Sequence, residues 1–324
     1  MTAHLDAGVL ERRASMQLVV LERPRIADGI VLLRLGHPEG LSLPPWQPGA
    51  HLEIVLPSGL IRHYSLCGDP DDPVTYIVAV LRVADGDGGS REIHDTDLDG
   101  LLLEVRGPRN NFALQPADRY LFIAGGIGIT PISAMVREIA GSDRPWRLVY
   151  GGRSRSSMAF LSELGDLAPV QLVPQDEQGL PDLVAELGAA AAGTAVYACG
   201  PPALLEVVTK LCANRPDLTL RLERFTTDGS TTPIGGGAFE VELRRTGIVL
   251  EVPQDRSLLD VVRDVVRTQP YSCAEGICGT CETEVLDGIP DHHDDVLSDA
   301  ERASNKTMML CVSRSKSPRL VLDL

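Results

Sequence analysis

The sequence predicts three successive units: an antiparallel β-barrel, an α/β unit with a parallel sheet, and a small α+β unit. Short apolar runs of strand length follow one another between turns in the first third of the chain, which indicates a barrel. Strand-like and helix-like runs then alternate, as in a parallel sheet with helices on its faces. The last part opens with two strand-like runs and a helix. We place the units at 1–116, 117–226 and 239–324, with 227–238 as a linker.

The composition is that of a packed protein without membrane segments. Of 324 residues, 44% are hydrophobic and 4% aromatic. No apolar run reaches the ~20 residues that cross a bilayer. Residues 1–7 lack the basic and apolar regions of a secretory signal. The net charge of −15 argues against nucleic acid as a partner, because phosphate contacts require basic surface. We therefore expect a cytoplasmic protein, and we expect a monomer.

Five strands are predicted in the first unit, each rich in leucine and β-branched residues and bounded by turn residues. They cover residues 18–22, 30–35, 51–56, 74–80 and 101–105. A stretch rich in proline and glycine, residues 44–49, forms the turn between the second and third strands.

Two short stretches of the first unit carry polar groups that suit a flavin. Arg62-His63-Tyr64-Ser65 combines a cation, an aromatic ring and a hydroxyl, which can serve the phosphate, the ring system and the N5 atom. The alternative is an ordinary strand with a surface arginine. Gly88-Gly89-Ser90 offers bare backbone N–H groups and a hydroxyl to a phosphate. The alternative there is a plain turn.

The second unit alternates strands with helices. Strands are predicted at 121–124, 147–150, 170–173 and 195–198, and helices at 131–139, 160–164, 180–187 and 203–212. Helices between successive strands allow those strands to run parallel in one sheet.

Three stretches of this unit are candidates for nucleotide binding. Gly125-Gly126-Ile127-Gly128-Ile129-Thr130-Pro131 joins a strand to a helix, where bare N–H groups and the helix dipole suit a pyrophosphate. Cys199-Gly200-Pro201 ends the last predicted strand, where ligands of open α/β sheets bind. A buried, inert cysteine is the alternative. Phe225, at the end of the unit, either covers a flavin ring or caps the core.

The segment after the second strand of this unit bears on the choice between NADH and NADPH. It reads Gly151-Gly152-Arg153-Ser154-Arg155-Ser156-Ser157. No acidic residue ends the strand to bind a ribose 2′-hydroxyl, whereas two arginines and three serines can accept a 2′-phosphate.

The third unit contains four cysteines in a distinctive pattern. Strands are predicted at 239–243 and 248–252, and a helix at 257–266 with Ser257 as its N-cap. Cys273, Cys278 and Cys281 form a C-x4-C-x2-C run, and Cys311 follows after a long gap. This is the plant-type [2Fe–2S] spacing, and it fits a zinc site less well. The glycines at 276 and 279 permit a tight loop around a cluster.

The remaining cysteines and one acidic stretch have simpler interpretations. The seven cysteines are an odd number in a chain without a recognisable export signal, so a disulfide framework is not expected. Cys67 and Cys212 are predicted to be packing residues. Residues 291–295, Asp-His-His-Asp-Asp, are predicted to form a solvated turn rather than a metal site.

Together these motifs resemble the phthalate dioxygenase reductase family, which includes the vanillate demethylase reductases. Similar modules lie behind the haem domain of self-sufficient cytochromes P450. The resemblance covers nearly the whole chain. It implies an FMN-binding barrel, a nicotinamide domain and a C-terminal plant-type ferredoxin domain of β-grasp fold. The implied cofactors are FMN, a [2Fe–2S] cluster and NADH, with NADPH also possible.

The resemblance also implies roles for individual residues. It places FMN against Arg62, His63, Tyr64, Ser65, Ala79, Val80, Leu81, Gly88, Gly89, Ser90, Thr130 and Phe225. It places the nicotinamide nucleotide against Gly125, Gly126, Ile127, Gly128, Pro131, Arg153, Cys199, Gly200 and Pro201. Cys273 and Cys278 would bind one iron, and Cys281 and Cys311 the other. Ser65, Cys199 and Phe225 would lie at the reaction centre.

The chain departs from the family at Leu81 and Asp87, where basic residues are common. With less positive charge near the flavin phosphate, we expect FMN to dissociate readily on dilution. A sub-nanomolar dissociation constant for FMN, measured by fluorescence titration, would contradict this expectation.

The implied function is that of a reductase. A hydride would pass from NAD(P)H to FMN, and single electrons would then pass through the cluster to a Rieske-type non-haem iron oxygenase. A cytochrome P450 as acceptor is the alternative. A flavin-free iron–sulfur protein that only binds or senses is a second alternative.

Overall fold

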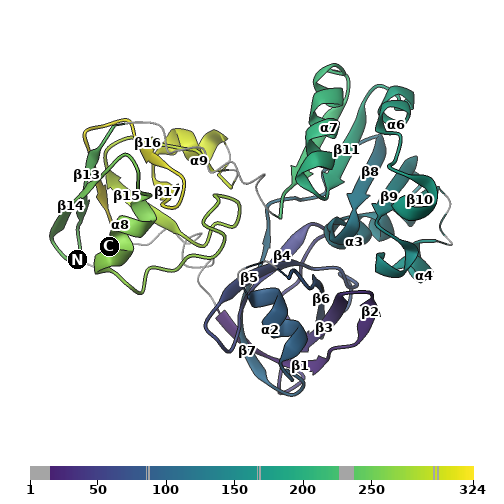
Figure 1. Ribbon diagram of the computed structural model, residues 1–324, viewed down its shortest axis with the longest axis horizontal. Coiled ribbons are helices and arrows are strands. Elements are labelled where there is room, and N and C mark those ends of the chain that lie inside the picture. The colour runs from purple at the N-terminus through teal and green to yellow at the C-terminus, as the bar shows by residue number, and fades with distance from the viewer. Residues whose placement is uncertain are drawn as a thin grey trace. The chain divides into compact units, whose positions relative to one another are not determined.

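The computed structural model describes residues 15–84, 86, 88–165, 167, 169–225, 237–294, 296–297 and 299–324 (Figure 1). The chain forms two compact units, residues 1–225 and residues 226–324, which are described separately below. Of the linker predicted at 227–238, all but residues 237 and 238 lie outside the described residues, as does Asp87.

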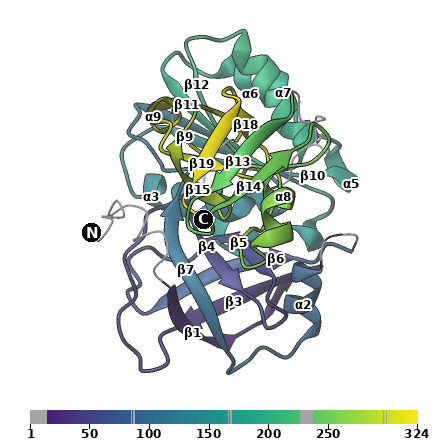
Figure 2. The ribbon, with the colours of Figure 1, turned by 90° about the vertical axis from the view of Figure 1, so that its left-hand side faces the viewer.

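The first unit begins with an antiparallel sheet that curls into a barrel (Figure 2). Its strands are β1 (Ser15–Glu22), β2 (Arg25–Ala27), β3 (Ile30–Gly36), β4 (Ala50–Val55), β5 (Ile61–Ser65), β6 (Thr75–Leu81) and β7 (Leu102–Asn110). The order is β2-β3-β1-β7-β4-β5, and β6 pairs with β3. A bridge between Leu66 and Val78 connects the end of β5 to β6 and completes the ring. The predicted barrel is confirmed, although β2 and β5 were not predicted as strands.

Alternation along the strands explains the barrel. On β4, Leu52 and Ile54 are fully buried in the barrel core, while His51 and Glu53, at the alternate positions, face the other side of the sheet. Side chains alternate between the two faces of a strand, so the inward positions form one apolar core. A short helix, α2 (Gly89–Asp95), follows β6 and contacts it.

The first unit continues with a five-stranded parallel sheet in the order β10-β9-β8-β11-β12. The strands are β8 (Arg119–Gly125), β9 (Trp146–Gly152), β10 (Val170–Pro174), β11 (Thr194–Cys199) and β12 (Thr219–Glu223). The helices are η1 (Gly126–Gly128), α3 (Ile129–Ala140), η2 (Arg155–Ser157), α4 (Leu161–Leu164), α5 (Gln175–Gln178), α6 (Leu183–Ala189) and α7 (Pro202–Ala213). The α/β prediction is therefore confirmed; β12 and α5 were not predicted.

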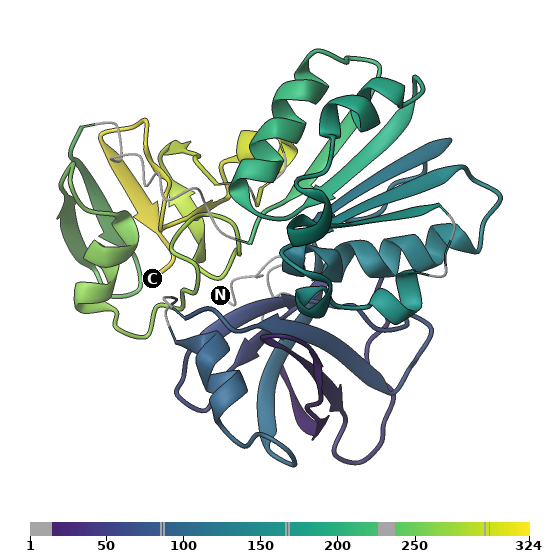
Figure 3. The same cartoon turned by 45° about the vertical axis from the view of Figure 1, so that its right-hand side comes forward.

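Helices cover both faces of this sheet, as Figure 3 shows. Phe122 of β8 packs in one core with Ile132 of α3, and its neighbour Ile123 packs in another core with Leu205 of α7. Central parallel strands are buried on both faces, which is why β8 and β11 read as nearly continuous apolar runs.

Specific contacts join the barrel to the parallel sheet. The Arg137 guanidinium of α3 donates to the carbonyl oxygens of Cys67 (2.8 Å) and Gly68 (3.1 Å). The Tyr197 hydroxyl of β11 accepts a hydrogen bond from the Gln115 amide at 2.7 Å. Strand β6 lies against η1. Two segments predicted to bind different cofactors, the end of β6 and the glycine loop, are thereby neighbours.

The second unit is a mixed sheet with a helix packed on it. The sheet has the order β14-β13-β19-β15-β17, and β13 and β19 run parallel. Its strands are β13 (Phe239–Leu243), β14 (Ile248–Val252), β15 (Glu282–Asp287), β17 (Thr307–Met309) and β19 (Arg319–Leu322). A second, two-stranded sheet pairs β16 (Pro290–Asp291) with β18 (Arg314–Ser315), and α9 (Asp299–Ser304) lies between β16 and β17 in the sequence.

Helix α8 (Leu258–Val265) begins as predicted. The Ser257 side chain accepts a hydrogen bond from the Asp260 amide at 3.0 Å, which is the N-cap arrangement. Leu258, Leu259 and Val262 bury one face of the helix in the core of the unit. A helix against a mixed sheet of this order is the β-grasp arrangement that the sequence predicted. No helix in the described part of the chain is long and apolar enough to cross a membrane.

Candidate functional site

Two loops meet at the carboxyl edge of the parallel sheet. The glycine loop follows β8, and Cys199-Gly200-Pro201 follows the neighbouring strand β11. A Cβ atom on Gly128 would lie 2.3 Å from the Cys199 carbonyl oxygen, so only glycine fits there. Strand β9 lies on the other side of β8, which makes this the point where the strand order reverses. Ligands of open α/β sheets bind at such a point.

Ser65, Cys199 and Glu223 come together from the two sheets of the first unit. Strand β11 pairs with β12, and Cys199 is the register partner of Glu223. The Glu223 carboxyl group shares a hydrogen bond with Ser65, which lies at the end of β5 and is buried. Two of the three predicted reaction-centre residues therefore lie around one carboxyl group that was not predicted.

Burial sets the protonation state of this group. Desolvation raises the pKa of Glu223 to about 8, and the hydrogen bond to Ser65 only partly opposes the shift. The Glu223 Oε2 atom is buried and has no hydrogen-bond partner among the described residues. Burial, with the nearby Glu223, also raises the pKa of the Cys199 thiol. Both groups are therefore neutral at pH 7.

The sequence contained a signal for Glu223 that was missed. The run Thr219-Leu-Arg-Leu-Glu223 alternates polar and apolar residues, as an outer strand does. Because β12 was not predicted, its last residue was not recognised as the neighbour of Cys199.

The two predicted phosphate-binding stretches of the barrel also converge. The Arg62 side chain of β5 crosses Gly89, where a Cβ atom would lie 2.5 Å from Arg62 Nε. The expected turn at 88–90 is corrected by the structure: Gly89 and Ser90 form the start of α2. The Ser90 hydroxyl accepts a hydrogen bond from the Val83 amide at 3.1 Å, which ties this helix to the end of β6. Arg62, the start of α2 and the end of β6 thus lie next to one another.

The other predicted flavin residues lie around this location. Ala79 and Val80 of β6 are buried, and the Val80 carbonyl oxygen is 2.9 Å from His94 Nε2 of α2. Burial raises the pKa of the Tyr64 phenol. Thr130 is buried at the start of α3, where its hydroxyl donates to the Ile127 carbonyl at 3.0 Å. Phe225 is 39% exposed at the end of the first unit.

His63 belongs to a cluster of charged and polar side chains on the outer face of the barrel. Its Nε2 atom is 3.6 Å from the Glu53 carboxylate, which also binds Arg106 at 2.6 Å. His51 lies 5.3 Å from the His63 ring, and burial lowers the pKa of His51 to about 3. His63 thus contacts Glu53 and His51 on the β4–β5–β7 face.

The arginine–serine loop after β9, residues 153–157, is less available to a 2′-phosphate than the sequence suggested. Arg155 Nε is 3.0 Å from Glu177 Oε1, and Glu177 lies on α5 after the adjacent strand β10. The hydroxyls of Ser154, Ser156 and Ser157 are hydrogen-bonded to one another. Arg153 is exposed. Glu177 was missed because an acidic residue was sought only after β9 itself.

The four predicted cluster ligands come together in the second unit. Cys281 Sγ and Cys311 Sγ are 3.3 Å apart. Hydrogen bonds from the Cys278 and Cys311 thiols lower the pKa of Cys273, and the Glu275 amide donates to its sulfur at 3.3 Å. Gly276, with a φ of +74°, turns the loop, and a Cβ atom there would lie 2.6 Å from Val312 Cγ2. Converging thiols with backbone N–H groups directed at sulfur fit an iron–sulfur cluster.

The arrangement fits a cluster better than a mononuclear zinc site. A [2Fe–2S] cluster takes only two thiolates per iron, whereas structural zinc takes four ligands around one ion.

The expected solvated turn at 291–295 is contradicted at Asp294, whereas His293 is exposed as expected. Asp294 is 2% exposed, and its Oδ1 atom accepts hydrogen bonds from the amides of Val296 (3.0 Å) and Leu297 (2.8 Å). Its Cα atom borders the cysteine loop, since a Cβ on Gly276 would lie 3.2 Å from it. The segment supports the cysteine loop from within the unit; Asp295 lies outside the described residues.

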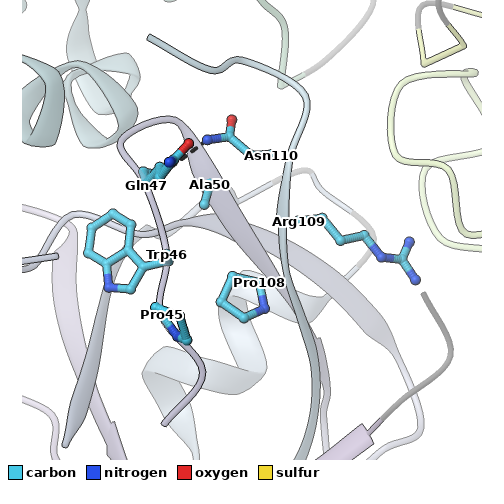
Figure 4. A pocket seen from close by; sticks show the side chains of 7 residues that line it. All are labelled: Pro45, Trp46, Gln47, Ala50, Pro108, Arg109 and Asn110. Carbon is cyan, nitrogen blue, oxygen red and sulfur yellow. Dashed lines mark hydrogen bonds between the residues drawn. The ribbon is translucent and has the colours of Figure 1, made fainter. Parts of the chain in front are cut away.

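The barrel also has a cleft that contains none of the predicted site residues (Figure 4). Pro45, Trp46, Gln47, Ala50, Pro108, Arg109 and Asn110 line it. The Asn110 amide donates to the Gln47 carbonyl at 3.2 Å across the cleft, and the Arg109 side chain points away from the other residues. These contacts hold the β3–β4 loop against β7.

Two family models match the chain at the candidate sites. Residues 241–316 match a 2Fe-2S iron-sulfur cluster binding domain, and this range contains all four cysteines. Residues 122–210 match an oxidoreductase NAD-binding domain, which contains the glycine loop and Cys199-Gly200-Pro201. The predicted [2Fe–2S] cluster and nicotinamide coenzyme are thus confirmed as classes of cofactor.

Known proteins resemble the whole chain. The phthalate 4,5-dioxygenase oxygenase reductase subunit of Pseudomonas putida is 39% identical over 95% of this chain and 96% of its own. A solved phthalate dioxygenase reductase, described as transferring electrons from pyridine nucleotides to [2Fe-2S], is 36% identical with a TM-score of 0.71, over 96% of this chain and 98% of that one.

A third relative is longer than this chain. An intact type IV self-sufficient cytochrome P450 monooxygenase matches 98% of this chain with 40% identity and a TM-score of 0.86, but this chain spans only 44% of its length. The chain belongs to the phthalate dioxygenase reductase family, and with that family come the oxidoreductase activity, the FMN, the [2Fe–2S] cluster and the nicotinamide coenzyme that the sequence predicted.

Proposed function

We propose that this chain is the reductase component of an oxygenase system, which takes a hydride from NADH and delivers single electrons through its cluster to the oxygenase. The observation that carries the proposal is the pairing of two sites in one chain. The first unit gathers Ser65, Cys199 and Glu223 where the glycine loop meets the barrel, and the second gathers four cysteines. A flavin-free binding protein would need only the second.

The redox chemistry would be supplied by the cofactors when bound, as acceptance of a hydride and release of single electrons. The chain supplies binding and electrostatics. Arg62 and the start of α2 suit the flavin phosphate, and the glycine loop suits the pyrophosphate of the coenzyme. We divide the first unit functionally at residue 116, with the flavin before it and the nicotinamide after it.

Two neutral groups would line the place where the nicotinamide meets the flavin. Arrival of a hydride adds negative charge, so an ionised carboxylate beside Ser65 would oppose it. A protonated Glu223 avoids that repulsion and holds the Ser65 hydroxyl in position. Cys199 remains a thiol and is fully buried, so it adds no charge beside Glu223. Phe225, exposed at the end of the unit, is the proposed cover of the flavin ring.

The contact between Arg62 and Gly89 supports a first test of the flavin site. Gly89→Ala would push the Arg62 side chain aside, because the new Cβ would lie 2.5 Å from its Nε. A hydrogen bond to a charged group contributes roughly 1.5–3 kcal/mol, so FMN should bind about tenfold or more weakly. Fluorescence titration of the flavin-depleted protein measures this change.

Gly188→Ala is the matched control. Gly188 lies on helix α6, which packs on the parallel sheet, and a Cβ atom there would meet nothing within 4 Å. It should leave FMN affinity unchanged. Equal FMN affinity in Gly89→Ala and the parent protein would show that Arg62 does not hold the phosphate.

The acceptor is proposed to be a Rieske-type non-haem iron oxygenase. Support comes from two relatives that this chain matches over nearly their whole length, at 96% and 98%, and that are named as reductases of phthalate dioxygenase systems. A cytochrome P450 is the second candidate, because the reductase part of a self-sufficient P450 resembles the chain equally well in sequence. We further propose a cytoplasmic monomer; the three cysteines outside the cluster site, Cys67, Cys199 and Cys212, are free thiols and suit a reducing compartment.

Anaerobic addition of NADH tests the function. The purified protein should show flavin absorbance near 450 nm beneath cluster bands, and NADH should bleach both. The reduced protein should then reduce a Rieske-type oxygenase faster than a P450. A spectrum without flavin, or a cluster that NADH leaves oxidised, would refute the proposal; faster reduction of the P450 would reverse the order of the two acceptors.

A further inference from the structure

An acidic residue, Glu177, contacts the arginine–serine loop at the carboxyl edge of the parallel sheet. The Glu177 carboxylate contacts Arg155 Nε with both oxygens, at 3.0 and 3.2 Å. Glu177 lies on α5, which follows β10, whereas Arg155 lies on η2, which follows β9. The Asp176 amide of α5 donates to the Arg153 carbonyl at 3.1 Å, which fixes the two loops together. Neighbouring strands therefore bring a carboxylate to the arginines.

The order of the strands indicates which part of the coenzyme reaches this place. The proposed pyrophosphate site lies at the carboxyl end of β8, and Cys199, the proposed neighbour of the nicotinamide, lies on β11 on one side of it. The adenosine half must then extend over the other side, across β9 and β10. Parallel strands end at the same edge, so the loops after β9 and β10 form the surface that the adenosine ribose meets.

We propose that Glu177 sets the coenzyme preference by neutralising Arg155 and placing negative charge where a 2′-phosphate would lie. This inference rests on the proposed function, and it names the coenzyme as NADH. The hydroxyls of Ser154, Ser156 and Ser157 bond to one another, so they favour the closed loop over a phosphate ligand. NADPH would have to displace Glu177 from Arg155 and remain beside its carboxylate.

The Arg155–Glu177 ion pair contributes little to the stability of the fold. Both side chains are about half exposed, at 51% for Arg155 and 46% for Glu177. Exposed ion pairs contribute little to stability, so removing the carboxylate should leave the fold intact. Its effect on a bound phosphate is larger, because a doubly charged group would lie beside a like charge.

The test is Glu177→Gln, which removes the charge and keeps the shape. The probes are 5′-AMP and 2′,5′-ADP, whose binding is measured by calorimetry, together with NADH and NADPH in anaerobic reduction. The ratio of 2′,5′-ADP to 5′-AMP affinity should rise about tenfold, as should the ratio of kcat/KM for NADPH over NADH. Because 5′-AMP and 2′,5′-ADP carry no hydride, their affinities are measured independently of the redox cofactors.

Glu186→Gln is the matched control. Glu186 of α6 binds Arg147 at 2.6 Å, also as an arginine–glutamate pair, near the opposite end of β9; Arg147 is 47% exposed and Glu186 15%. It should leave both ratios within about twofold of the parent value. An unchanged ratio in Glu177→Gln, an equal change in Glu186→Gln, or a parent protein that prefers NADPH would overturn the inference. If neither coenzyme reduces the parent protein, the proposed function itself fails.

Discussion

Cys278→Ser should abolish electron delivery to the oxygenase while NADH-dependent reduction of ferricyanide continues. Cys278 is 7% exposed in the cysteine loop, and its thiol is one of those that contact Cys273. Serine oxygen is a poor iron ligand in place of thiolate, so the cluster should be lost or altered. Ferricyanide can accept from the flavin directly. Oxygenase reduction should fall at least about a hundredfold and dye reduction by no more than about twofold.

Stopped-flow reduction of the two acceptors by the same preparation measures this split. Cys212→Ala is the control: Cys212 is a buried thiol in the core between the parallel sheet and α7, within the first unit. It should support both reactions. Loss of dye reduction in Cys278→Ser would contradict the expectation, because it would mean that the cluster also maintains the first unit.

The parts of the fold that the sequence predicted are those whose signals are local. The apolar alternation of β4, the glycine loop before α3 and the spacing of the cysteines each follow from a few adjacent residues. Period and spacing are properties of short segments, so they can be read without knowledge of tertiary contacts. The same reasoning explains why Ser257 was correctly assigned as an N-cap.

The parts that were missed depend on contacts between segments far apart in the sequence. Glu177 is significant only because β10 lies beside β9, and Glu223 only because β12 lies beside β11. Asp294 was expected in solvent, since a run of acidic residues is usually exposed. Its carboxylate accepts hydrogen bonds from two amides close to it in the sequence, but Asp294 also borders Gly276 of the cysteine loop, and that contact between distant segments is not revealed by a local pattern.

The second large effect is expected from Glu223→Gln. In the parent protein, hydride transfer from NADH should slow as the pH rises through about 8, where the raised pKa of Glu223 allows the carboxyl group to ionise. Glutamine keeps the shape and the neutral state, so the rate should become independent of pH in this range. Rapid-mixing measurements between about pH 6 and pH 9 follow the step directly. Glu206→Gln, on the exposed side of α7, is the control and should retain the parent profile.

The pH dependence of the free energy of unfolding tests the protonation of Glu223 independently of the reaction rate. The native state holds a proton on Glu223 up to pH about 8, whereas the unfolded chain releases it near the ordinary value of 4.5. Between these values the native state binds more protons, so the free energy of unfolding should fall as the pH rises. Glu223→Gln should remove that part of the slope in denaturant titrations. An inflection near pH 8 that persists in both the rate and the stability of Glu223→Gln would assign it to another group and would remove Glu223 from the reaction centre.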